Sequence, residues 1–152
     1  MIHPARYRPA LVALLATLPW LIAAPRARAT SLTVSGAYFR VVLPNLPAAG
    51  YMTLTNSGVR PVTVIGLETS GCGSVMLHRS MNRNGMDRMA PVPSVTVAPH
   101  SVFRFAPGGY HLMCMSARLR LGHDVLARVK LQNGGSVTAR FAVIGVHPSG
   151  SP

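Results

Sequence analysis

Acidic residues are scarce in this sequence. Glu68, Asp87 and Asp124 are the only three among 152 residues, which also include 15 lysines and arginines. Catalysis by paired carboxylates needs two acids at one site, and calcium or magnesium sites need several oxygen ligands. Three scattered acids supply neither, and no Ser/His/Asp set is evident. The composition therefore argues against an enzyme and against a site for a hard metal ion.

Cysteine is also scarce, since the chain contains only Cys72 and Cys114. A metal site formed by histidine and methionine without a pair of thiolates would hold zinc poorly. The two cysteines could form one disulfide in an oxidising compartment. Whether they approach each other cannot be read from the sequence, and their pairing stays open at this point.

Residues 1–29 have the pattern of a secretory signal peptide. Two arginines precede an apolar stretch at residues 10–24, and Ala27-Arg28-Ala29 offers small residues for cleavage. The apolar stretch is too short and too broken by proline for a membrane span. No cysteine lies at the cleavage point, which argues against a lipoprotein anchor. We expect export to the periplasm, without stable membrane insertion after cleavage.

Cleavage would leave one domain at residues 30–146 and a flexible tail at residues 147–152. The signal peptide takes four arginines with it, so the remaining 11 basic and 3 acidic residues give 11 − 3 = +8. Such a charge attracts anionic surfaces, whether those of acidic proteins or of phospholipid headgroups. Export and the scattering of the arginines argue against nucleic acid as a partner.

The expected domain is rich in short strands and has no sustained helical period. Val125, Ala127, Val129 and Leu131 alternate with more polar residues, and Asn133-Gly134-Gly135 then signals a hairpin. Evenly spaced strands with turn signals predict an all-β antiparallel sandwich or barrel. The expected strands are 32–42, 49–55, 61–68, 74–79, 87–90, 94–98, 101–105, 110–115, 125–132 and 136–144.

Histidine and methionine are over-supplied, with 6 and 8 residues, and they concentrate between residues 76 and 115. Asn84-Gly85 favours a two-residue type I′ turn. If this turn sets the register, His78 lies opposite Pro91, and Met89 lies one diagonal step from His78 on the same face. Met81 and Met86 then point to the other face.

A second histidine and methionine follow at His111-x-Met113, where residues two apart on a strand share a face. Together the four residues form the pattern H-x10-M-x21-H-x-M, whose accidental occurrence at this chain's own frequencies is roughly one in two thousand. Thioethers select Cu(I), and imidazole suits copper in either oxidation state. The pattern therefore predicts a copper site at His78, Met89, His111 and Met113.

The remaining histidines and methionines have ordinary interpretations. Met115 could be a spare ligand, although core packing fits it better, and His147 in the tail could assist Cu(II) binding. Packing accounts for Met52 and Met76, and solvation in a turn for His100.

Three segments carry a family resemblance: Val75–His78, Gly85–Met89 and Pro107–Met113. In these segments the chain resembles the PCu(A)C-type periplasmic copper chaperones. The resemblance implies a cupredoxin-like β-barrel that binds Cu(I) through two His and two Met, here His78, Met89, His111 and Met113. The chain departs from the commoner family pattern at Cys114 and in the Gly71-Cys72-Gly73 loop.

The resemblance also implies a function that is not enzymatic. It implies copper delivery to the binuclear centre of cytochrome c oxidase, often alongside a thiol-bearing assembly factor, and we expect a monomer. Cu(II) binding stays open. One alternative is an electron-transfer cupredoxin, which would need a cysteine thiolate beside two histidines and an axial methionine. The other is a structural β-sandwich in which the histidines and methionines are incidental.

Overall fold

The computed structural model describes residues 31–146, apart from the side chains of Arg83 and Asp87. The expected signal peptide and the tail with His147 lie outside these residues. Ten strands account for most of the described chain: β1 (Leu32–Val41), β2 (Ala48–Asn56), β3 (Val62–Thr69), β4 (Ser74–Arg83), β5 (Met86–Pro91), β6 (Val95–Val97), β7 (Ser101–Phe105), β8 (Tyr110–Met115), β9 (Asp124–Leu131) and β10 (Ser136–Gly145).

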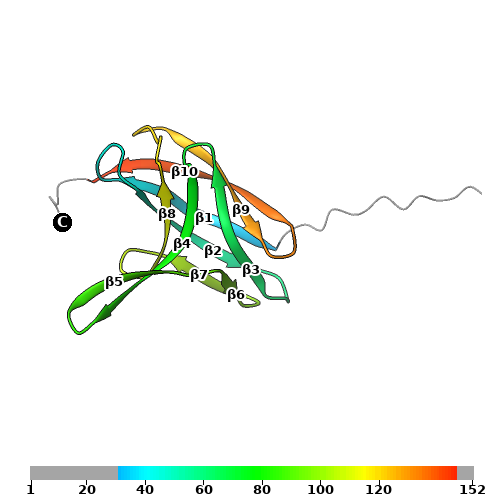
Figure 1. Ribbon diagram of the computed structural model, residues 1–152. Coiled ribbons are helices and arrows are strands. Elements are labelled where there is room, and N and C mark those ends of the chain that lie inside the picture. The colour runs from blue at the N-terminus through cyan, green and yellow to red at the C-terminus, as the bar shows by residue number, and fades with distance from the viewer. Residues whose placement is uncertain (1–30, 147–152) are drawn as a thin grey trace, which may run out of the picture.

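The strands form one curled sheet in the order β5-β4-β8-β2-β1-β10-β9-β3-β6, with β7 paired to β2 (Figure 1). The prediction of an all-β domain is confirmed, and the observed strand bounds lie within a few residues of the expected ones. One pair differs from the antiparallel expectation, because β1 and β10 run parallel. These strands lie at opposite ends of the described chain, so no hairpin imposes an antiparallel pairing on them.

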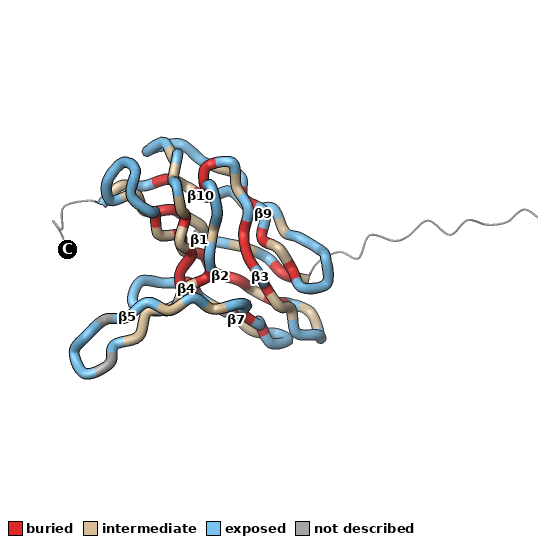
Figure 2. The backbone as a smooth tube through the Cα atoms, in the orientation of Figure 1, coloured by how far each residue is buried: buried red, intermediate tan, exposed pale blue. Residues whose placement is uncertain are grey.

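The core fills the inside of the curled sheet and follows the alternation of the sequence (Figure 2). Ala127, Val129 and Leu131 of β9 are buried, as predicted. Phe39 of β1 stacks on Phe141 of β10 with ring centroids 5.0 Å apart. The first and last strands therefore close the domain through a packed aromatic pair.

Cys72 and Cys114 form a disulfide, which answers the question that the sequence left open. Cys114 lies on β8 and is fully buried, while Cys72 precedes β4. The backbone N–H of Gly73 also donates to the carbonyl of Met115 at 2.9 Å. These links fasten the beginning of β4 to the end of β8, and the predicted ligands His78, His111 and Met113 lie on these two strands.

Candidate metal centre

The first part of the candidate site is the hairpin of β4 and β5, which projects away from the rest of the sheet (Figure 1). Asn84 and Gly85 at its tip both have positive φ, 54° and 78°, as a type I′ turn requires. His78 pairs with Pro91, and Met89 pairs with Ser80. The register predicted from the turn is therefore confirmed.

The second part is the pairing of β4 with β8, which places His78 directly opposite His111. Their ring centroids are 5.7 Å apart and their planes are inclined at 73°. Met113 lies two residues beyond His111 on the same face of β8. Two predicted imidazoles and one predicted thioether thus meet on two adjacent strands.

A turn before β8 orients His111. Gly108 in this turn has a φ of 77°, which is the left-handed region that favours glycine. The carbonyl of Gly109 accepts a hydrogen bond from the backbone N–H of Ser80 at 3.0 Å and lies 3.2 Å from His111 Nδ1. A carbonyl can only accept, so Nδ1 carries the proton and Nε2 keeps a lone pair for a metal ion.

The ring nitrogen Nδ1 of His78 is buried. It has no hydrogen-bond partner among the described residues. Burial, and then the neighbouring His111, lower the pKa of His78, which favours the neutral ring that a metal ion needs. An unsatisfied buried polar atom costs about 1–3 kcal/mol. A bound metal ion would satisfy it.

The four predicted ligands are not equally close to one another in the strand register. His78, His111 and Met113 are immediate neighbours, whereas Met89 lies on the projecting β5 with 61% of its surface exposed. The described residues contain no group of three or more His, Cys, Asp or Glu side chains that could hold a metal ion. Met113, two residues from His111 on β8, is a candidate third ligand for this pair of histidines.

The structure also shows a methionine that sequence reasoning assigned to packing. Met76 is 40% exposed and pairs with Met113 across β4 and β8, so packing does not account for it. Its spacing of two residues from His78 was the available signal, because residues i and i+2 share a strand face. The other interpretations hold: Met52 is buried, Met81 and Met86 lie on the opposite face of the hairpin, and His100 is exposed.

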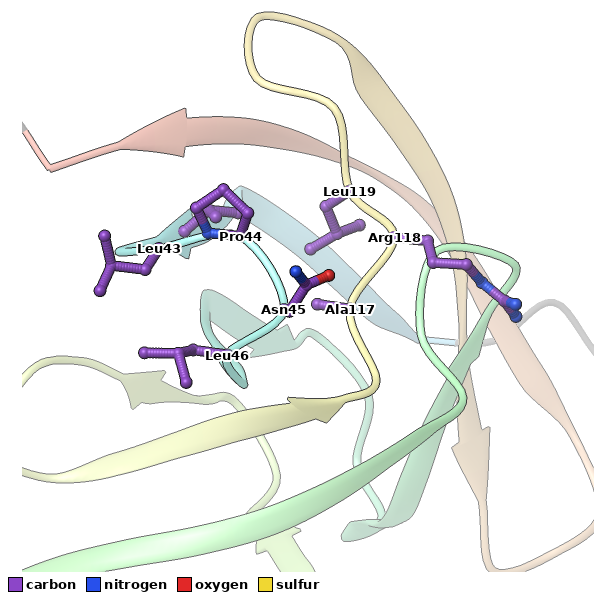
Figure 3. Close-up of a pocket in the computed structure, with 8 residues that line it drawn as sticks. Leu43, Pro44, Asn45, Leu46, Ala117, Arg118 and Leu119 are labelled. Atoms are coloured by element: carbon purple, nitrogen blue, oxygen red, sulfur yellow. The ribbon is translucent and has the colours of Figure 1, made fainter.

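A hollow of about 230 Å³ lies elsewhere, between the loops that follow β1 and β8 (Figure 3). Leu43 and Leu46 line it from one loop, and Ala117 and Leu119 line it from the other. Arg118 points away from Leu43 and Leu46 in this view. No histidine, methionine or cysteine lines the hollow, so it offers no soft ligand for a metal.

Comparison with known proteins identifies a family and a relative. Residues 32–143 match the family described as "Putative lipoprotein LpqE-like". A relative from Leifsonia xyli subsp. xyli, described as "Putative lipoprotein Lxx21020", is 27% identical over 122 residues, which cover 78% of this chain and 73% of the relative. Both descriptions point to an exported protein associated with the cell envelope.

Solved structures with the same fold include copper-binding domains. The copper-bound PCuAC domain from PmoF2 has a TM-score of 0.64 at 23% identity, covering 76% of this chain and 94% of that domain. Apo-DR1885 from Deinococcus radiodurans has a TM-score of 0.59 at 29% identity, covering 96% of each chain. Its Cu(I) form has a TM-score of 0.60 at 28% identity, covering 80% and 81%. The predicted cupredoxin-like fold is confirmed.

The lipoprotein description belongs to the relatives. In this sequence both cysteines lie in the disulfide, and neither follows the expected cleavage point. The described part of the chain has no helix that is long and apolar enough to cross a membrane.

Proposed function

Because the chain belongs to the LpqE-like family and shares its fold with PCuAC domains, we propose that it binds Cu(I) in the cell envelope and passes it to an acceptor protein. The proposed ligands are His78, His111, Met113 and Met89. The observation that carries the proposal is the unsatisfied His78 Nδ1 beside His111. Both rings carry nitrogen donors that a metal ion can use, and His78 lacks the hydrogen bond that would satisfy its Nδ1 in a purely structural role.

The ligand chemistry favours Cu(I) over other ions. Thioether sulfur is soft and binds Cu(I), while imidazole completes a site without any negative charge. Two of the chain's three acids, Glu68 and Asp124, are already paired with Lys130 and Arg140. Neither of these two carboxylates is on β4 or β8, so we expect the histidine pair to hold a hard divalent ion poorly and to prefer Cu(I). Whether Cu(II) also binds is a separate measurement.

The exposure and the charge of the hairpin support delivery to an acceptor. Met89 is exposed, and Arg79 and Arg88 of the same hairpin are exposed as well. An acidic acceptor could dock here, and its thiolates would take Cu(I) by ligand exchange because they bind it more tightly than thioethers do. We propose the copper subunit of cytochrome c oxidase, or a thiol-bearing assembly factor, as the acceptor.

The electron-transfer alternative lacks its principal ligand. Blue copper requires a cysteine thiolate, and Cys114 is buried in the disulfide with Cys72. Cys114 also alternates with Met113 along β8, so it points to the opposite face. No observation favours this second function while the disulfide is intact.

Copper binding is tested by titrating the protein with Cu(I) against a chromophoric chelator. We expect one tightly bound ion, and we expect His111→Ala and Met113→Leu to weaken binding by at least about tenfold each. His123→Ala is the matched control, because His123 is exposed in the loop before β9. Equal affinity in His111→Ala and the control would contradict the ligand assignment and favour a structural β-sandwich.

Delivery is tested separately by mixing the Cu(I)-loaded protein with a purified copper-binding domain of the oxidase subunit. We expect copper to move to the acceptor, at a rate that falls as salt screens the arginine-rich hairpin. Retention of copper by the chain in the presence of excess reduced acceptor would leave binding intact and contradict this acceptor.

A further inference from the structure

Met76 lies on the same face of the sheet as the proposed copper ligands. It precedes His78 by two residues on β4 and pairs with Met113 of β8. Its neighbour Leu77 is buried in the core, whereas 40% of the surface of Met76 is exposed. The strand alternation thus turns Met76 toward the side of the sheet that carries the two imidazoles.

In the strand register, Met76 lies nearer to Met113 than Met89 does. Met76 and Met113 are direct cross-strand partners, and such partners have Cβ atoms about 4.5–5.5 Å apart. Met89 lies on β5 opposite Ser80, so it is two strands and four residues away from Met113 along the sheet. On a flat sheet this separation would be roughly 16 Å between Cα atoms. Only bending of the hairpin would bring the sulfur of Met89 to an ion held against Met113.

His78 therefore has a methionine on each side of it. Met89 lies toward the tip of the hairpin, and Met76 lies toward the base of β4. Both side chains are flexible, since methionine has three rotatable bonds and no branch. Either one could supply a thioether to an ion that already contacts His78, His111 and Met113.

We propose that Met76 is an additional Cu(I) ligand, which contacts the ion together with His78, His111 and Met113 when Met89 is displaced. The proposal rests on the proposed copper function and adds a residue to the same site. The step is an exchange of one neutral thioether for another, so neither electrons nor protons are transferred. This exchange would keep the ion coordinated while the exposed side chain of Met89 contacts an acceptor.

Affinity measurements in a double-mutant cycle test this proposal. Leucine keeps the volume and the apolar character of methionine but removes the sulfur. We expect Met76→Leu and Met89→Leu each to weaken Cu(I) binding by up to about tenfold, because the other thioether substitutes. The double variant should weaken Cu(I) binding by more than the product of the two single fold-changes. Met86→Leu is the matched control, since Met86 is exposed on the opposite face of the same hairpin.

A spectroscopic readout tests the contact itself. With methionine methyl groups labelled with ¹³C, one equivalent of Ag(I), a redox-inert substitute for Cu(I), should shift the methyl signal of Met76 in the Met89→Leu variant and leave that of Met86 in place. An unmoved Met76 signal there, or a Met76→Leu affinity equal to that of Met86→Leu with no excess loss in the double variant, would overturn the proposal. Failure of the proposed function has a different signature, namely a wild-type protein that does not compete with the chelator for Cu(I).

Discussion

His78 and His111 face each other across β4 and β8, with ring centroids 5.7 Å apart. Each ring is held differently. The N–H of His111 donates to the carbonyl of Gly109, whereas His78 Nδ1 has no partner among the described residues. The ring of His111 is thus held in the tautomer that leaves Nε2 free for a metal ion, and the ring of His78 presents an unsatisfied nitrogen.

The first prediction concerns the pH dependence of His78. Burial and the neighbouring His111 lower its pKa below the ordinary value of 6.5. The unfolded chain therefore binds more protons at this residue than the folded chain, and stability should fall as the pH drops below about 6.5. An NMR titration of the apoprotein should give a midpoint for His78 below 6.5.

His78→Gln provides the control for this prediction, because glutamine does not titrate. The variant should show a shallower loss of unfolding free energy between about pH 6.5 and pH 5 than the wild type. A midpoint at or above 6.5, or an unchanged slope in His78→Gln, would contradict the described environment of this ring.

The second prediction concerns the disulfide between Cys72 and Cys114, which are 42 residues apart in the sequence. A cross-link of this length restricts the unfolded chain, so Cys72→Ala/Cys114→Ala should lower the free energy of unfolding by about 3–4 kcal/mol. Denaturation in urea measures this loss. Because Cys114 points away from Met113, the folded variant should still bind one Cu(I) ion. Loss of copper from a variant shown to be folded would mean that a cysteine takes part in the site.

The third prediction concerns Asn56, which is fully buried at the end of β2. Its Nδ2 donates to the carbonyls of Arg60, Val97 and Ala98, and its Oδ1 accepts from the backbone N–H of Gly58. Asn56→Leu would leave these groups without their partner, at a cost of about 2–4 kcal/mol.

Asn133→Ala is the comparison for Asn56→Leu. Asn133 also accepts from a backbone N–H, that of Gly135, but it does so in an exposed turn. Its replacement should change the free energy of unfolding by no more than about 0.5 kcal/mol. Similar losses for the two variants in thermal or chemical denaturation would refute the importance of burial at Asn56.

Local patterns were sufficient to predict most of the fold. The alternation at Ala127, Val129 and Leu131 predicted the buried face of β9, because side chains alternate along a strand. Asn84-Gly85 predicted the pairing of His78 with Pro91, because a two-residue turn fixes the register of its hairpin. In both cases the information lies within a few residues.

Features that depend on distant parts of the chain could not be predicted. The parallel pairing of β1 with β10 arises only when the sheet curls and closes. The disulfide requires the loop before β4 to meet the end of β8, and no spacing rule encodes that approach. Met76 is a different case, because its spacing of two residues from His78 places both on one strand face and is visible in the sequence. The packing interpretation was wrong because it weighed the apolar neighbours of Met76 and not this spacing.

The most direct test of the account is the Cu(I) affinity of the protein with both histidines replaced. Competition against a chromophoric chelator should show one tightly bound Cu(I) in the wild type and in His123→Ala, and no competitive binding in His78→Ala/His111→Ala. Circular dichroism of the double variant should retain the β-sheet signal, which separates loss of the site from loss of the fold. An affinity in the folded double variant equal to that of the wild type would contradict the copper site at the pairing of β4 with β8.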